Sequence, residues 1–260
     1  MPERNAAYGR LPPRRPAYSR TISRLLFLLC CLLCLASGCG DGASSPEEIR
    51  LGTDQSTSGA PAPKAERGTV VAALGDSITA GSPLWDPDEA VLAQIGPAAD
   101  PASQYEYWAE RRTPDAQFRN CGAPGERTDE IAARLDGCAE GADVLIVQGG
   151  INDIGQMRPV EEVARNLRGM VTRGKQLELR VGIVEVLPWN NGGEAAEPLI
   201  RRLNRLIADI GADEDVPVFP WYGRLEDPDA PGRMKAEWTI DGNHPSVEGY
   251  RRLADVVQLP

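Results

Sequence analysis

The segment TVVAALGDSIT, residues 69–79, sets the architecture of the chain. Its first part, Thr69–Leu74, is a short apolar run that predicts a β-strand. The pentapeptide GDSIT at residues 75–79 follows directly and places the hydroxyl of Ser77 at the N-terminal end of a helix. The segment therefore predicts a strand that runs directly into a helix.

The same alternation continues along the chain. Further strands are predicted at Ala116–Asn120, Asp143–Val147, Leu179–Val186 and Val216–Phe219. Helices are predicted around Gln104–Arg112, Thr128–Leu135, Val160–Arg173, Ala195–Ile210 and Val247–Val257. Three of the strands are near-continuous runs of Val, Ile and Leu, as in strands that helices cover on both faces. The pattern predicts an α/β fold, a three-layer α/β/α sandwich with a mostly parallel five-stranded sheet.

The composition and charge exclude several classes of protein. The chain has 260 residues, 42% hydrophobic and 25% charged, which is typical of a folded globular protein. Residues 1–38 carry a net charge of +5, so the total of −10 leaves −15 on the rest of the chain. Because so acidic a body repels a phosphate backbone, we expect no nucleic-acid partner.

Histidine and cysteine are too few for the common metal sites. His244 is the only histidine, and four of the six cysteines lie within the first 39 residues, which leaves Cys121 and Cys138. A zinc site needs several imidazole or thiolate ligands. We therefore expect no metal.

The N-terminal segment has the layout of an export signal. An arginine-rich stretch precedes the apolar run LLFLLCCLLCL at residues 25–35. The run is shorter than the roughly 20 apolar residues of a transmembrane helix, which favours a signal peptide over an uncleaved anchor. The tetrapeptide ASGC at residues 36–39 also resembles a bacterial lipobox, in which the signal is cut before a cysteine that receives lipid. We expect a signal peptide over residues 1–38 and lipidation of Cys39.

A linker is predicted between the signal and the folded part. Residues 40–67 are rich in Gly, Ser, Thr, Pro and Ala, and Ile49 and Leu51 are their only large apolar side chains. Such a segment cannot bury enough apolar surface to fold. We expect residues 39–67 to be a flexible linker and residues 68–260 to form a single domain.

The sequence leaves open whether Cys121 and Cys138 form a disulfide. Export to an oxidising compartment favours the bond. A full helix over Thr128–Leu135 opposes it, because about 10 Å of helix would separate its two ends, whereas a disulfide needs Cα atoms within about 7 Å.

Three more segments with polar or glycine-rich character follow predicted strands or approach the C terminus. They are NCGAPG at 120–125, GGIND at 149–153 and DGNHPS at 241–246. In parallel α/β sheets the working residues lie in loops at the carboxyl ends of the strands. These segments and the GDSIT turn therefore predict one shared site. Asp76 and Asp153 within them are interpreted as capping and loop-ordering residues.

Together the four segments resemble the SGNH (GDSL-type) hydrolase family of esterases and lipases. The resemblance covers residues 69–257 and implies a flavodoxin-like fold. It implies that Ser77 is the nucleophile, His244 the general base and Asp241 the residue that orients the imidazole. It also implies an oxyanion hole made by the backbone N–H groups of Ser77 and Gly125 and by the side-chain amide of Asn152.

These roles agree with the chemistry of the side chains. Serine is a weak nucleophile that needs an adjacent base, and a third group must orient that base. His244 is the only imidazole, and a carboxylate three residues before it can reach its Nδ1 across a short turn. Gly125 and Asn152 supply donors for a developing oxyanion. No cofactor is required.

The loop at 187–193 follows the fourth predicted strand, so Trp189 and Asn190 are predicted to contact substrate. We expect a serine esterase acting on short acyl groups, such as O-acetyl groups on carbohydrates or small esters. The alternatives are a lysophospholipase, long-chain lipase or thioesterase and, in another class, a catalytically silent carbohydrate-binding lipoprotein. The expected location is extracytoplasmic, anchored to a membrane through lipid on Cys39, or secreted if the lipobox is not used.

Overall fold

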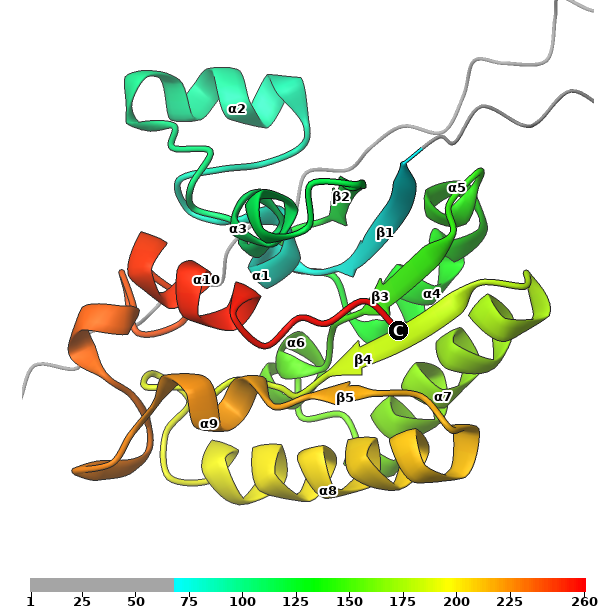
Figure 1. Ribbon diagram of the computed structural model, residues 1–260. Helices are drawn as coiled ribbons and strands as arrows, with labels where there is room; N and C mark the ends of the chain where they lie inside the picture. Colours follow the sequence, from blue (N-terminus) through cyan, green and yellow to red (C-terminus); the bar gives the residue numbers. More distant parts are fainter. Residues whose placement is uncertain (1–67) are drawn as a thin grey trace, which may run out of the picture. The chain divides into compact units, whose positions relative to one another are not determined.

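The computed structural model describes residues 68–260, which form three layers around one sheet (Figure 1). The predicted signal peptide (1–38), Cys39 and the linker (39–67) lie outside these residues. Five strands pair in parallel in the order β2-β1-β3-β4-β5. They are β1 (Thr69–Gly75), β2 (Ala116–Gly122), β3 (Val144–Val147), β4 (Arg180–Val184) and β5 (Val218–Phe219). This order is the flavodoxin-like one, and the predicted α/β/α sandwich is confirmed.

Helices cover both faces of the sheet (Figure 1). One face packs against α4 (Thr128–Ala133), α5 (Leu135–Ala139), α7 (Val160–Gln176) and α8 (Ala196–Glu214). The other packs against α1 (Ser77–Ala80), α3 (Tyr105–Arg112), α9 (Trp221–Leu225) and α10 (Val247–Ala254). Alternate residues of β1 divide between the two cores: Ala72 and Leu74 face the first, Val71 and Ala73 the second. Because both faces are covered, the central strands are apolar throughout, as their sequences indicate.

Smaller elements surround this framework. They are α2 (Glu89–Ile95), α6 (Ile151–Gly155), the antiparallel pair β6 (Glu226–Asp227) and β7 (Ala230–Met234), and two 3-10 turns at Gly96–Ala98 and Ala236–Trp238. Helix α2 contributes no buried residue. Within residues 68–260, no helix is both long and apolar enough to cross a bilayer.

The edge strand β5 is shorter than predicted. The sequence predicts a strand from Val216, but regular pairing begins at Val218. Pro217 accepts a hydrogen bond from Ile183 N (3.0 Å) but has no N–H to donate.

Cys121 and Cys138 form a disulfide, with their Cα atoms 6.1 Å apart. The geometric argument against the bond is wrong because the predicted helix over Thr128–Leu135 is not continuous. Helix α4 ends at Ala133, and α5 begins after Arg134. The break brings Cys138 back to the end of β2, where Cys121 lies.

Candidate active site

Ser77 begins α1, and Asp76 alone separates it from β1. The carboxylate of Asp76 accepts a hydrogen bond from Ile78 N (2.9 Å) and caps the helix, the role expected for it. Position 75 has room for glycine alone, because an added Cβ would lie 2.2 Å from Thr79 Oγ1. Strand β1 is an inner strand that pairs with β2 on one side and β3 on the other, so the turn holds Ser77 on a rigid support.

The structure brings Ser77, His244 and Asp241 together. Ser77 Oγ lies 3.1 Å from His244 Nε2, although 167 residues separate the two in sequence. His244 Nδ1 lies 2.7 Å from Asp241 Oδ2. The serine is nearly buried, and the side chain of His244 is 21% exposed. The imidazole thus contacts a hydroxyl on one side and a carboxylate on the other.

Asp241 also orders the backbone of its own loop. Its Oδ1 accepts hydrogen bonds from the backbone N–H groups of His244 (2.7 Å) and Asn243 (2.8 Å). Partial burial raises the pKa of Asp241, but the hydrogen bonds from His244 and Asn243 outweigh it and leave the pKa below its ordinary value. The carboxylate therefore stays ionised at neutral pH, as a partner of an imidazolium must.

Asn152 and Gly125 lie on adjacent segments. Asn152 is the second residue of α6, and its Nδ2 donates to the carbonyl of Glu126 (2.9 Å), the neighbour of Gly125. Gly125 has a φ of +82°, a conformation that favours glycine. The Gly125 loop also reaches the turn that carries Ser77, because Ala123 N donates to the carbonyl of Gly75 (3.0 Å).

Asp153 and Arg134 fasten these segments to each other. The Asp153 carboxylate accepts from Thr128 N and Thr128 Oγ1, both at 2.9 Å, so it orders the loop before α4, as predicted. Burial raises the pKa of Asp153, against these two bonds. Arg134 donates to the carbonyls of Gly75 (3.0 Å) and Cys121 (2.9 Å), at the ends of β1 and β2.

Trp189 and Asn190 lie in the loop after β4, as predicted, and their polar groups contact protein. Trp189 Nε1 donates to Asn243 Oδ1 (2.6 Å). Asn190 Oδ1 accepts from Met234 N (2.6 Å), and its Nδ2 donates to the carbonyl of the same residue (3.0 Å). Contact of either side chain with substrate stays a prediction.

The sequence reasoning missed four side chains that order the site: Gln148, Arg134, Asn191 and Asn243. Gln148 directly precedes the GGIND segment, and Asn243 lies within the DGNHPS segment. Their positions beside predicted site residues therefore indicate a role in the site. Arg134 carries no local signal, because it acts on a carbonyl group 59 residues away. Asn191 lies in the loop at 187–193 singled out from the sequence, but its partner, the carbonyl of Asp241, is 50 residues away.

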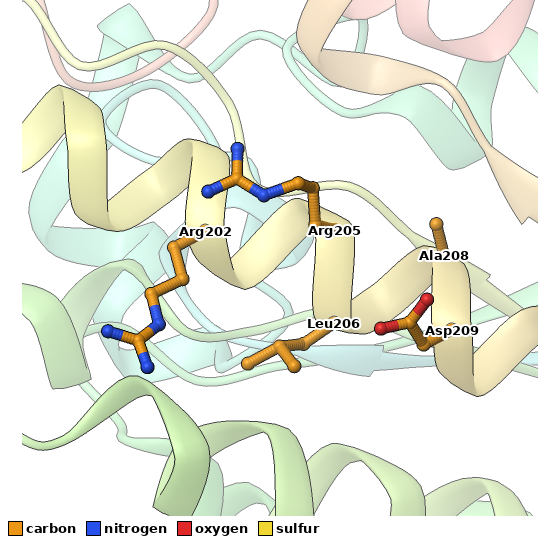
Figure 2. Close-up of a pocket in the computed structure, with 5 residues that line it drawn as sticks. All are labelled: Arg202, Arg205, Leu206, Ala208 and Asp209. Atoms are coloured by element: carbon orange, nitrogen blue, oxygen red, sulfur yellow. The ribbon is translucent and has the colours of Figure 1, made fainter.

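A separate surface hollow lies along the outer side of α8 (Figure 2). It is lined by Arg202, Arg205, Leu206, Ala208 and Asp209. It contains neither a nucleophile nor an imidazole, so we place the chemistry at the strand ends instead. Over residues 68–260, no cluster of three or more His, Cys, Asp or Glu side chains could hold a metal ion.

Solved structures share this fold at low sequence identity. A member of the lipolytic G-D-S-L family from Veillonella parvula is 18% identical, with a TM-score of 0.58, over 72% of this chain and 94% of its own. A lipase/acylhydrolase from Enterococcus faecalis is 24% identical, with a TM-score of 0.56, over 72% and 92%. A variant of an acetyl-xylooligosaccharide esterase from Geobacillus is 18% identical, with a TM-score of 0.56, over 74% and 94%.

No curated protein matches the chain. The sequence itself matches the family model of the GDSL-like lipases and acylhydrolases over residues 73–252, a range that runs from β1 into α10 and includes the four recognised segments. The chain therefore belongs to the GDSL-like lipase/acylhydrolase family of ester hydrolases.

Proposed function

We propose that this chain is a serine esterase with Ser77, His244 and Asp241 as its catalytic triad. The observation that carries the proposal is the continuous contact from Ser77 Oγ through the imidazole of His244 to Asp241. His244 Nε2 takes the hydroxyl proton as Ser77 Oγ attacks the ester carbonyl, and Asp241 stabilises the imidazolium. The imidazolium then protonates the leaving alkoxide. Water, deprotonated by the same imidazole, releases the acid from the acyl-enzyme.

The negative charge of the tetrahedral intermediate requires donors that are already in place. The backbone N–H groups of Ser77 and Gly125 and the amide of Asn152 are the proposed donors. The bond from Asn152 to Glu126 uses one of its two amide hydrogens, which leaves the other for the oxyanion. Such prearranged donors cost no reorganisation during reaction.

The proposed substrates are esters of short acyl groups, such as O-acetyl groups on carbohydrates or small molecules. Polar side chains adjoin the loop that carries His244: Asn243 lies within it, and Asn191 donates to the carbonyl of Asp241 and to Asn243 Oδ1. The structural neighbour from Geobacillus, named an acetyl-xylooligosaccharide esterase, gives this choice further support.

Lysophospholipids and other long-chain esters, or thioesters, are the second class of candidate substrates. Ile240, next to Asp241, is 44% exposed, and Met157, just beyond α6, is 89% exposed. Exposed apolar side chains beside these elements suit an acyl chain.

We also propose that the protein is exported and anchored through lipid on Cys39. The disulfide between Cys121 and Cys138 supports an oxidising compartment. Incorporation of labelled fatty acid by the full chain, and none by Cys39→Ala, tests the anchor.

The activity test is hydrolysis of p-nitrophenyl esters, from acetate to palmitate, by the full chain beside Ser77→Ala and His244→Ala. We expect the rate to fall with chain length and to drop about 10⁴-fold or more in both variants. Ser103→Ala is the matched control, since this serine is buried and donates to the carbonyl of Gly81. A folded wild-type chain that neither turns over esters nor reacts with a fluorophosphonate would favour a silent carbohydrate-binding protein.

A further inference from the structure

The indole of Trp189 lies between two parts of the proposed site. Its Nε1 donates to Asn243 Oδ1 at 2.6 Å. The far edge of the ring lies over Gly155 of α6, where an added Cβ would be 3.3 Å from Cη2 of the indole. Because α6 carries Asn152, the ring connects the oxyanion side of the site with the loop at 241–244.

Asn191 strengthens the same connection. Its Nδ2 donates to the carbonyl of Asp241 (2.7 Å) and to Asn243 Oδ1 (2.9 Å). The backbone N–H of Asn190 donates to the carbonyl of Gly242 (3.0 Å). Gly242 has a φ of +83°, and a Cβ there would lie 2.9 Å from Asn191 Nδ2. The loop at 241–244 is therefore bonded at three successive residues.

The indole has little freedom to move. It packs against the core on the α7 and α8 side of the sheet. Gly192 lies so close that an added Cβ would be 2.4 Å from Cε3 of the ring. The Nε1 edge and the six-membered ring of the indole thus contact separate parts of the fold, and loss of the Nε1 hydrogen bond would free the side chain of Asn243 from the indole.

We propose that Trp189 and Asn191 are positioning residues that act through Asn243 to set His244 in line with Ser77. This inference rests on the proposed function, since it concerns the geometry of that reaction. It differs from the sequence-based expectation that Trp189 contacts substrate. Loss of a substrate contact raises KM, whereas loss of alignment lowers kcat.

Trp189→Phe tests the proposal in the full chain, because it keeps a ring and removes the N–H donor. Trp108→Phe is the matched control: Trp108 is part-buried on α3, and its Nε1 donates to the carbonyl of Ala102 (2.9 Å). With p-nitrophenyl acetate, we expect Trp189→Phe to lower kcat about 10-fold or more, with KM within about twofold of wild type. The rate of fluorophosphonate labelling at Ser77 should fall in parallel. Trp108→Phe should leave both rates within about twofold of wild type.

A double-mutant cycle with Asn243→Ala identifies the path. If Trp189 acts through Asn243, Trp189→Phe should cause no further loss of kcat in the Asn243→Ala background. Additive losses would overturn the proposal, as would a rise in KM at unchanged kcat or an equal loss of kcat in Trp108→Phe. A wild-type chain that is neither active nor labelled would instead overturn the proposed function itself, so the two failures are distinguishable.

Discussion

Gln148 Oε1 lies 2.9 Å from the backbone N–H of Asp76 and accepts its hydrogen bond. The same oxygen accepts a second bond, from Thr79 Oγ1 (2.9 Å). Gln148 follows β3 and the other two residues lie on either side of Ser77, so this side chain fixes the turn that carries Ser77 to the neighbouring strand.

Gln148→Met removes that acceptor while keeping the length of the side chain. It leaves the Asp76 N–H buried without a partner, so we expect the free energy of unfolding to fall by about 1 to 3 kcal/mol. The turn should also lose alignment, with a lower kcat. Urea unfolding and ester hydrolysis measure the two effects, and unchanged stability would contradict the assigned role of Gln148.

Asn152→Ala should lower kcat about 100- to 1000-fold with little change in KM, because the amide is proposed to act only on the developing oxyanion. Asn204→Ala is a suitable control. Asn204 is buried, and its side chain hydrogen-bonds the backbone N–H and carbonyl of Val186. Its replacement should therefore lower the free energy of unfolding and leave kcat unchanged. Equal kcat losses in the two variants would argue against an oxyanion role for Asn152.

Asp76 makes stability depend on pH. Its complete burial raises its pKa from 3.8 to about 6, against the lowering effect of the Ile78 N–H. The folded state therefore binds this proton more tightly than the unfolded state does. The resulting stabilisation is complete below about pH 4 and is lost as pH rises through about 6.

Asp76→Asn lacks this titration but keeps an oxygen that can accept the bond from Ile78. The free energy of unfolding of the variant, minus that of wild type, should therefore grow by about 2 kcal/mol from pH 4 to pH 7. Urea unfolding at several pH values gives this difference. The contributions of all other titrating groups to the free energy of unfolding are nearly the same in the two proteins, so they cancel in the difference. A difference that stays flat would show that Asp76 has an ordinary pKa.

Removing the disulfide should destabilise the domain. It closes a loop of 17 residues, which corresponds to about 3 kcal/mol in the chain-entropy account. The double variant Cys121→Ala and Cys138→Ala should unfold at lower urea and be insensitive to dithiothreitol, whereas wild type should shift on reduction. If reduction frees both thiols of the wild-type protein but leaves its urea unfolding midpoint unchanged, this expectation is contradicted.

Much of the fold could be predicted from sequence because its signals are local. The short strand-like segments of the sequence give all five strands of the sheet, three of them as apolar runs, and each of the first three strands is followed by a segment of the site. The pairing of Ser77 with His244 is what the resemblance to the SGNH hydrolases implies, since the loop that carries the imidazole does not follow a strand of the five-stranded sheet. Helix α2 was missed because it has no buried face, which is the signal that periodicity detects.

What could not be predicted depends on contacts between distant segments. The break at Arg134, which permits the disulfide, occurs where that side chain bonds the carbonyls of Gly75 and Cys121. The polar edge of Trp189 bonds a residue 54 positions away. No pattern within either loop indicates such a partner, so position alone suggested a substrate contact for Trp189.

The 167 residues between Ser77 and His244 have a consequence for biosynthesis. A chain made from its N terminus contains Ser77 well before His244 has been added. Under the proposed mechanism, the serine has no base until the loop before α10 docks, so the growing polypeptide is expected to be inactive. Labelling of Ser77 would then report completed folding, since it requires the last segment of the chain to be in place.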